Sequence, residues 1–439
     1  MKKFAAVFAG TALLAMSAAG TVNAAFTVGG ENGWQLSTDG IVDVFETYMS
    51  VSKYPSGTRS ISFLSLNPGT TQSNQVTVGL LPSVIAFNIK APTVNGIESN
   101  VRVGIYPSIQ NSSGEGGVDS QNRFQTSPNI DFREFFYTAK GKYGEFLAGR
   151  ALNLYQGKSI LADMVLLTSG VVPIPRLGTT TTLGHIGYGY LYTNFSAQMR
   201  YTTPDFSGFK VAFEIAEPYN ISAQTGKTNT PRLETEISYA TTMGKGITLQ
   251  AYLSGLYQGA TRNDVVGGAR AVRPGGYENS LGGDAGVTVG FSGVELHAAS
   301  YVGQGLGMIS AQDGALAAAV VGGNPLNGPS NAVDGGGYNR TQFGFLAQAT
   351  YQINPDWKLG INYGQNRQIE SDYDKARRPV YGTGYGIPMF KQEAVDVMVV
   401  YNLTKFIQFI GEYAYAQNTW ADSATQHSNS FNFGTMFYW

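Results

Sequence analysis

The sequence predicts an all-β fold, a transmembrane antiparallel up-and-down β-barrel, and three observations support this prediction. Long segments alternate apolar and polar side chains with a period of two. The connections between them alternate between long and short, and the last segment ends on a row of aromatic residues. In segment 340–353 one row holds Phe343, Phe345, Ala347, Ala349, Tyr351 and Ile353, and the other holds Arg340, Gln342, Gln348, Thr350 and Gln352. A membrane barrel requires this pattern because neighbouring side chains face lipid and water in turn.

About sixteen strands follow from this periodicity, although about fourteen or eighteen would also fit. The predicted strands cover 36–50, 75–90, 100–108, 132–140, 145–153, 193–203, 208–217, 232–241, 246–257, 281–291, 294–302, 340–353, 357–366, 392–403, 406–417 and 428–439. An even number of strands places both termini on the periplasmic side. Long extracellular loops and short periplasmic turns are therefore expected.

A soluble β-sandwich would show the same alternation, since one of its faces is buried. Sandwich strands are usually about five or six residues long, which is shorter than the segments here. The alternation of long and short connections and the aromatic ending also favour the barrel.

The N-terminus has the features of a secretory signal peptide. Lys2 and Lys3 precede the apolar segment 4–19, and Val22-Asn23-Ala24 fits a cleavage site of the A-x-A type. We therefore expect a signal peptide over residues 1–24 and a single barrel domain over 25–439. No second stretch of about 18 apolar residues follows, so no transmembrane helix is predicted.

Composition excludes several classes of function. Without Lys2 and Lys3, the 29 Lys and Arg fall to 27 against 30 Asp and Glu, so the net charge is −3 and lacks the basic excess of a nucleic-acid-binding protein. The absence of cysteine excludes disulfides and thiolate metal sites. The three histidines, His185, His297 and His427, lie in no catalytic or metal-ligand motif. We expect no enzyme, no metal and no cofactor.

Three passages resemble the general bacterial porins, which are trimeric sixteen-stranded barrels of the outer membrane. The segment 429–439 alternates outward aromatic residues and ends on one, segment 146–150 (Phe-Leu-Ala-Gly-Arg) resembles the strand before the porin third loop, and segment 199–209 resembles a porin hairpin. In the family the terminal aromatic row is the signal that the barrel assembly machinery reads. The corresponding residues here are Phe431, Phe433, Phe437 and Trp439, although the family ending is usually Phe.

The resemblance implies a third loop folded into the lumen, here 154–170, and a homotrimer in contact with outer-membrane lipid and lipopolysaccharide. The family loop usually carries several acidic residues, whereas this loop has only Asp163 beside Lys158, so the sequence does not predict cation selectivity. The alternation of side chains along each strand predicts that Arg102, Arg150 and Arg200 point inward, and Arg133 is a further candidate. The opposite wall carries Glu214, Glu234, Glu236, Asp284 and Glu295. These charges would either create a transverse field across the pore or simply be solvated in the lumen.

The predicted function is a water-filled channel for passive diffusion of ions and small hydrophilic solutes, with mild or no ion selectivity. The third loop is rich in apolar residues, Leu161, Met164, Val165, Leu166 and Leu167. These residues would either pack against the wall or form an apolar path for aromatic solutes. A substrate-specific channel for aromatic or anionic solutes, or a barrel within an electron-conduit or adhesive surface complex, therefore remains an alternative.

Overall fold

The computed structural model describes most of the chain beyond the predicted signal peptide. Its described residues are 26–60, 62–64, 71–109, 130–173, 181–222, 225, 230–244, 246–266, 269–270, 273–311, 320–321 and 332–439. The predicted signal peptide lies outside them. No helix in the described part of the chain is long and apolar enough to cross a membrane.

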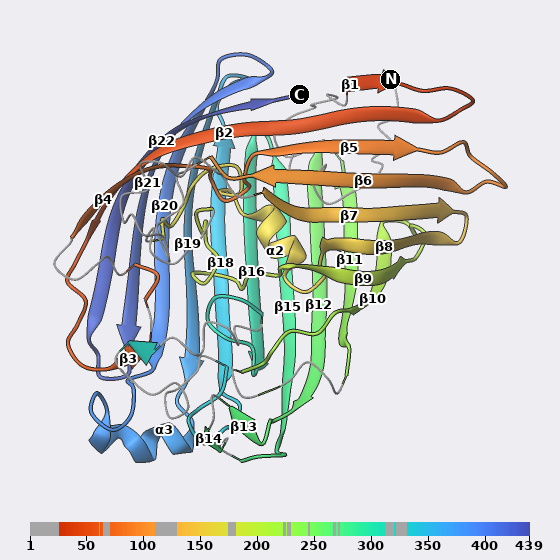
Figure 1. Cartoon of the computed structure of the whole chain (residues 1–439). Coiled ribbons are helices and arrows are strands. Elements are labelled where there is room, and N and C mark those ends of the chain that lie inside the picture. Colours follow the sequence, from red (N-terminus) through yellow and green to blue (C-terminus); the bar gives the residue numbers. More distant parts are fainter. Residues whose placement is uncertain are drawn as a thin grey trace, which may run out of the picture.

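The strands form one closed antiparallel barrel with sixteen strand positions (Figure 1). The ring contains β2 (Gln35–Val51), β4 (Gln72–Thr77) with β5 (Val84–Lys90), β6 (Glu98–Pro107), β7 (Ile130–Gly141), β8 (Gly144–Leu152), β9 (Phe195–Thr202), β10 (Phe209–Ala216), β11 (Arg232–Met243), β12 (Ile247–Thr261), β15 (Tyr277–Phe291), β16 (Val294–Gln304), β18 (Thr341–Gln352), β19 (Trp357–Ile369), β20 (Met389–Asn402), β21 (Ile407–Trp420) and β22 (Thr425–Tyr438). Pairing of β22 with β2 closes the ring. The short β1 (Phe26–Gly29) adds to β2 outside this count. The predicted all-β barrel is confirmed, and a sandwich is excluded.

The predicted second strand, 75–90, is interrupted in the structure. Both β4 and β5 pair with β2, and residues 78–83 leave the ladder between them. The carboxylate of Asp43 holds this segment, because it accepts hydrogen bonds from Gly79 N at 2.5 Å and from Ser83 Oγ at 2.8 Å. The interruption brings Leu80 to the interior of the barrel, where its N–H donates to Thr168 O at 2.9 Å.

Long and short connections lie at opposite rims. We name the long connections L1 (52–71), L2 (108–129), L3 (153–194), L4 (217–231), L5 (262–276), L6 (305–340) and L7 (370–388). The short elements within them are β3 (Arg59–Ser60), α2 (Gly157–Ala162), β13 (Val265–Val266), β14 (Ala269–Arg270), β17 (Val320–Val321), α3 (Asp372–Arg377) and η3 (Arg378–Val380). Figure 1 shows α3, β13 and β14 at one end of the barrel and the marked N and C ends at the other.

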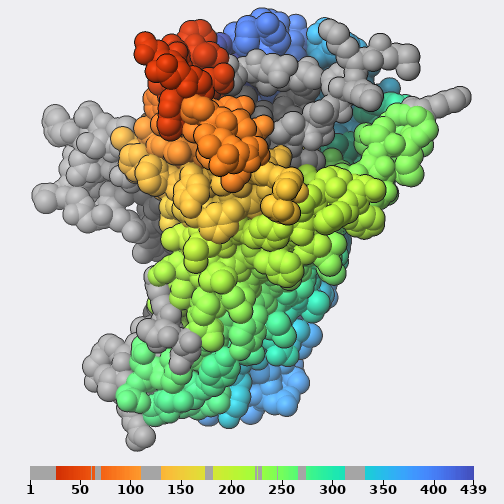
Figure 2. Space-filling view, turned by 90° about the vertical axis from the view of Figure 1, so that its right-hand side faces the viewer, coloured from red at the N-terminus to blue at the C-terminus, as the bar shows by residue number. Residues whose placement is uncertain are grey.

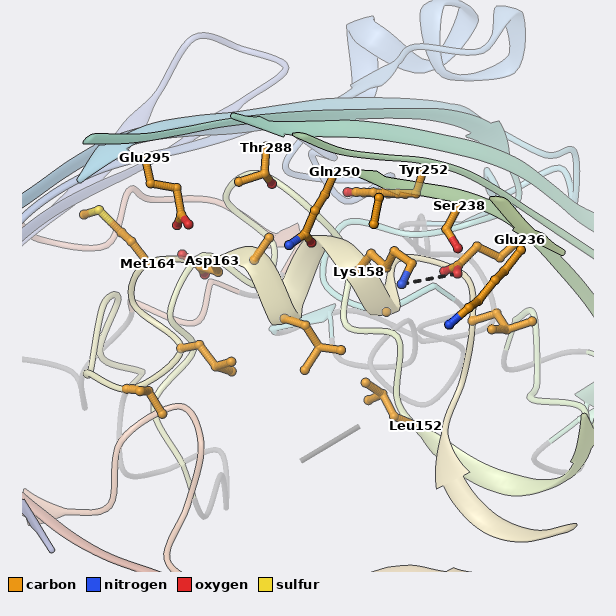
Figure 3. A pocket seen from close by; sticks show the side chains of 18 of the residues that line it. Leu152, Lys158, Asp163, Met164, Glu236, Ser238, Gln250, Tyr252, Thr288 and Glu295 are labelled. Carbon is orange, nitrogen blue, oxygen red and sulfur yellow. Dashed lines mark ion pairs between the residues drawn. The ribbon is translucent and has the colours of Figure 1, made fainter. Parts of the chain in front are cut away.

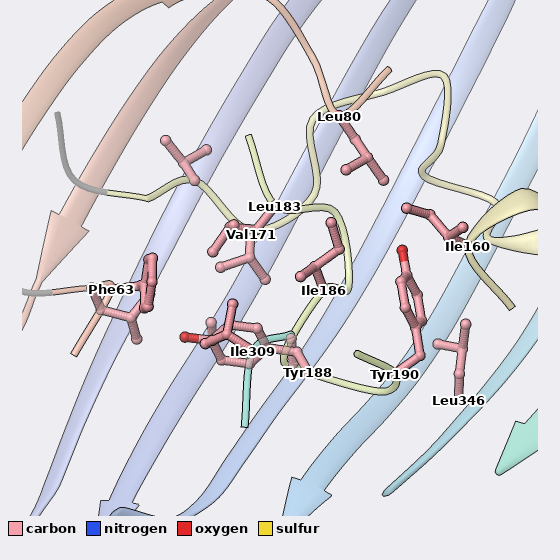
Figure 4. Close-up of a cluster of buried hydrophobic side chains, with 14 of the residues drawn as sticks. Phe63, Leu80, Ile160, Val171, Leu183, Ile186, Tyr188, Tyr190, Ile309 and Leu346 are labelled. Atoms are coloured by element: carbon pink, nitrogen blue, oxygen red, sulfur yellow. The ribbon is translucent and has the colours of Figure 1, made fainter. Parts of the chain in front are cut away.

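Apolar side chains also pack inside the barrel. Three loops, L1, L3 and L6, contribute to a buried cluster that rests on the inner wall, where Leu346 of β18 belongs to it. Figure 4 shows Phe63 of L1, Ile186 of L3 and Ile309 of L6 gathered against these strands. The cluster fixes the loops by burial of apolar area, as a small protein core would. Much of the lumen toward the long-loop rim is therefore filled by folded chain.

Candidate pore constriction

The third long loop is folded into the lumen, and its base is anchored to the wall that it leaves. Tyr155 N donates a hydrogen bond to Glu234 on β11 at 2.6 Å. At the returning end, Leu191 N donates to the side-chain oxygen of Gln156 at 2.7 Å. Gln156 has a positive φ of 62°, which turns the chain into the short helix α2. The predicted inward fold of this loop is therefore found in the structure, with bounds of 153–194 rather than 154–170.

On the far side of the lumen, L3 meets the wall through His185. Its Nε2 contacts the carboxylate of Asp396 on β20, and both side chains are fully buried. The ring nitrogen Nδ1 lies 3.1 Å from Tyr188 O, which orients the imidazole. Burial alone would lower the pKa of His185, but the charges of Asp396 and Asp163 outweigh it and raise the pKa to about 9. The imidazole is therefore charged at neutral pH and forms a buried ion pair.

A second clamp is the carboxylate of Glu412 on β21. It accepts hydrogen bonds from Thr168 Oγ1 at 2.8 Å, from Gly170 N at 2.9 Å and from Asn432 Nδ2 at 3.0 Å. Two of these three donors belong to L3. A buried carboxylate is stable only when such donors surround it, so the loop and the wall satisfy each other.

The helix α2 packs on the wall formed by β11, β12 and β15. Ser159 Oγ lies 2.7 Å from Tyr252 Oη and 3.2 Å from a carboxylate oxygen of Asp284. Lys158, the residue before Ser159, places its Nζ 3.4 Å from Glu236 Oε1, and the Lys158 side chain keeps 28% of its exposure. Among the described residues of L3, this pair is a charged contact with the wall that solvent reaches.

A cavity of about 1620 Å³ opens beneath L3 toward the short-turn rim. One side is polar and is formed by the barrel wall; it includes Glu236, Ser238, Gln250, Thr288 and Glu295 (Figure 3). The other side is an apolar ledge of L3 and its flanks, formed by Leu152, Leu154, Leu161, Met164, Leu166 and Leu167. The cavity therefore presents both charge and apolar surface to a solute.

Two of the three arginines expected in the lumen, Arg102 and Arg200, are found there, but in ion pairs. Arg102 is buried and contacts Asp39 at 3.0 Å and Glu134 at 2.8 Å. Arg200 contacts Glu214 at 2.7 Å and lines the cavity. The predicted basic wall is thus neutralised locally, and Glu214 does not stand opposite it but on the neighbouring strand.

The remaining acidic candidates and Arg133 are also engaged in contacts. Glu234 pairs with Arg232 besides accepting from L3. Asp163 accepts hydrogen bonds from Tyr190 Oη at 2.6 Å and Val165 N at 3.1 Å, so its carboxylate serves the fold of the loop, and burial raises its pKa. Arg133 pairs with Asp131 at 2.7 Å, and its guanidinium lies over the ring of Tyr106.

Arg150 differs from the expectation, because it points out of the barrel. It lies directly opposite Phe135 on β7 and Ala197 on β9, which are exposed on the outer surface, and Arg150 is itself exposed. Directly opposed residues of an antiparallel ladder share a face. The inward side of β8 instead carries Leu147 and Ala151, which form an apolar cluster with Phe136.

The final strand places its aromatic residues as expected from the sequence. Phe431, Phe433 and Phe437 are 57%, 61% and 45% exposed on the outer face. Trp439 packs beside Phe437, and its backbone exchanges hydrogen bonds with Gly40. A Cβ at position 40 would collide with the Trp439 ring, so glycine is required at this close approach. Whether the row acts as an assembly signal remains a prediction.

The residues that clamp L3 were not recognised from the sequence. Asp396 and Glu412 point inward on their strands, and this orientation alone does not identify the loop that each one contacts. His185 lies far from both in the chain and in no motif. The signal that could have identified them is a charged residue in a polar row opposite an otherwise apolar loop.

Comparison with known proteins decides the family. The family model described as "Gram-negative porin" matches residues 9–421. The chain belongs to this porin family. It is therefore an outer-membrane channel for solute diffusion, and its long-loop rim is extracellular while its short-turn rim is periplasmic. No curated protein matches the sequence.

Solved structures of porins share the fold at low sequence identity. The outer membrane channel DcaP of Acinetobacter baumannii is 14% identical, with a TM-score of 0.64 over 94% of this chain and 100% of that chain. An anion-selective porin from Comamonas acidovorans is 14% identical, with a TM-score of 0.58 over 92% and 100%. OmpT of Vibrio cholerae in its trimer form is 12% identical, with a TM-score of 0.51 over 93% and 100%.

Proposed function

We propose that this porin conducts ions and small hydrophilic solutes past L3, with weak selectivity for charge. The observation that carries this proposal is the cavity of about 1620 Å³ beneath L3, which is lined by side chains of both signs. Its lining includes Lys140, Lys158, Lys210 and Lys358 together with Glu145, Asp205, Glu236 and Glu295. A solute of either sign therefore meets both attraction and repulsion along the wall.

Local pairing of charges supports weak selectivity. Lys158 lies beside Glu236, and Arg200 lies beside Glu214. A paired charge produces a short-range dipole, whose field falls off faster than that of a lone charge. The transverse field expected for two separated rows of opposite charge is correspondingly weaker.

The assembly of the porin is part of the same proposal. We infer a homotrimer in outer-membrane lipid and lipopolysaccharide, because a porin with the same fold has a trimer form. We also infer export with cleavage of residues 1–24 and recognition of the aromatic C-terminal row by the barrel assembly machinery. N-terminal sequencing of the mature protein should begin at Ala25, and any other start would contradict the cleavage site.

Planar-bilayer recording tests the channel proposal. We expect large ohmic steps in groups of three and a reversal potential near zero in a gradient of potassium chloride. A strong preference for cations or anions would contradict weak selectivity. The absence of steps from detergent-purified, folded protein would contradict an open passage.

A second candidate function is facilitated passage of aromatic or other amphiphilic solutes, and the apolar ledge favours it. Leu161 and Leu167 are partly exposed on this ledge, which faces the polar wall across the cavity. A solute with an apolar body and a polar end would contact both sides. Current block by benzoate at concentrations where acetate has no effect would support this candidate, and equal behaviour of the two anions would exclude it.

A further inference from the structure

Two charged side chains of opposite sign point outward from the middle of the barrel wall. Glu46 of β2 lies opposite Phe433, which is 61% exposed, and Arg150 of β8 lies opposite Phe135, which is 60% exposed. Both charged residues are themselves exposed. Neither forms a hydrogen bond or ion pair with any residue that the structure describes.

Both charges lie at the height of the membrane. Glu46 is five residues along β2 from Ile41, which pairs with the penultimate residue Tyr438, and Arg150 is six residues from the tight turn at Gly144. With a rise of about 3.4 Å per residue and a tilt of about 40°, Glu46 lies roughly 13 Å above Ile41 and Arg150 roughly 16 Å above Gly144, while β2 itself begins below Ile41, at Gln35. The apolar band of such barrels is about 25 Å tall, and a charge on the lipid face is most destabilising near its middle. Glu46 and Arg150 therefore need surroundings other than lipid.

Elsewhere on the outer wall, charged side chains occupy outward positions on β19 and β20, where Arg367, Lys391 and Glu393 lie near the long-loop ends of the strands and Lys391 pairs with Glu393. On β9, β10, β11, β12, β15, β16 and β18 no outward position carries Asp, Glu, Lys or Arg. On β2, β4, β21 and β22, by contrast, the outward rows include the polar residues Tyr48, Ser50, Asn74, Tyr413, Tyr415, Gln417 and Asn429. Figure 2 shows the face on which the bands of the orange, yellow and green strands follow one another. The outer wall thus has an apolar sector suited to lipid and a more polar sector that includes Glu46.

We propose that Glu46 of one copy pairs with Arg150 of the next copy in a ring of identical chains. The inference rests on the proposed trimer and names the contact that joins its subunits. Glu46 and Arg150 lie on strands separated by β4 with β5, β6 and β7, so they flank one sector of the wall. Rotational symmetry brings one flank of each copy against the other flank of its neighbour, and opposite charges on the two flanks make this contact complementary.

Charge reversal tests the pair in the full-length porin. The variants are Glu46→Arg, Arg150→Glu and the double variant that carries both, with trimer dissociation followed by unheated SDS gel electrophoresis and light scattering in detergent. We expect each single reversal to raise the dissociation constant about tenfold or more, because it places like charges together in the interface. The double variant restores opposite charges and should return the dissociation constant to within about threefold of the wild-type value.

Neutral variants keep the test informative if a reversed charge prevents folding. Glu46→Gln and Arg150→Gln should each loosen the trimer if these residues face a partner. If they face lipid instead, removal of the charge should leave the trimer unchanged and make the barrel more resistant to heat. Met199→Gln, on the apolar sector and 54% exposed, is the matched control and should not affect trimer dissociation.

The outcomes separate this inference from the proposed function. A wild-type protein that is monomeric in mild detergent would overturn the trimer itself. A trimeric wild type with unaltered single variants, or a double variant no better than the singles, would overturn the pairing alone. The pairing of Glu46 with Arg150 would be established if both single variants weakened the trimer and the double variant restored it.

Discussion

His185 of L3 and Asp396 of β20 form a buried ion pair between residues 211 positions apart in the chain. The pair ties the loop that narrows the channel to the wall opposite its point of origin. The backbone N–H of His185 also lies 3.3 Å from a carboxylate oxygen of Asp163, so one residue connects the wall to the internal structure of the loop. The position of L3, and with it the width of the passage, depends on this contact.

Replacement of His185 by Ala should loosen L3. The change leaves Asp396 buried without its cation, and breaking a buried pair in this way costs about 3–5 kcal/mol. We expect noisier single-channel currents and faster cleavage of L3 by added protease, with the barrel still folded. His427→Ala is the matched control, because His427 lies on the outer face against Tyr415. A quiet channel with a protected loop in H185A would show that the pair does not hold L3.

Alkaline pH should loosen the same contact. The pKa of His185 is raised from 6.5 to about 9 in the folded protein, so the imidazolium stabilises the folded loop fully below pH 6.5. This contribution decreases above 6.5 and is lost as the pH rises through about 9. Current noise recorded across this range should increase toward its upper end in the wild type. The H185A channel should show no such increase, and an equal rise in both proteins would assign the effect to another group.

Gly364 on the inner face of β19 permits the close approach of L3. A Cβ at this position would lie 2.0 Å from Tyr188 O and 2.6 Å from His185 Nδ1. Gly364→Ala should therefore displace the loop and increase current noise as H185A does. Gly283→Ala is the matched control, because no atom lies within 4 Å of a Cβ there. Identical behaviour of the two alanine variants would contradict the packing role of Gly364.

The barrel could be predicted because the alternation of apolar and polar side chains is visible within each strand by itself. Each strand of β18 to β22 shows an apolar row and a polar row, and pairing with the next strand requires only local register. The contacts of L3 could not be predicted in this way. They join Glu412 or Asp396 to residues more than two hundred positions earlier, and no local pattern encodes which loop reaches which wall.

The orientation of Arg150 was predicted incorrectly for a physical reason that β8 makes visible. The rule that charged residues face the lumen assumes that the outer face meets lipid everywhere. At the level of Arg150 the inner face of β8 is apolar, with Leu147 and Ala151 packed against Phe136, and the Arg150 charge is outside. Such a reversal is expected where another protein surface replaces lipid.

Arg150→Ala should accordingly leave the conductance of a single channel unchanged. The guanidinium lies outside the wall, so its removal alters neither the width nor the charge of the passage. Conductance and reversal potential of the variant, measured in potassium chloride, should match those of the wild type. A shift in either quantity would show that the side chain reaches the lumen.

Lys158 and Glu236 should control the small charge selectivity that remains. They form the contact between α2 and β11 at the cavity, with Lys158 partly exposed to solvent. Lys158→Gln removes the positive member, so Glu236 should then favour cations, and Glu236→Gln should favour anions by the same argument. Because the site is solvated, we expect permeability ratios to change only about two- to threefold.

The double variant should return to the wild-type ratio, since it removes both charges together. Reversal potentials in a potassium chloride gradient measure all three cases, and shifts of the same sign in both single variants would contradict the assignment.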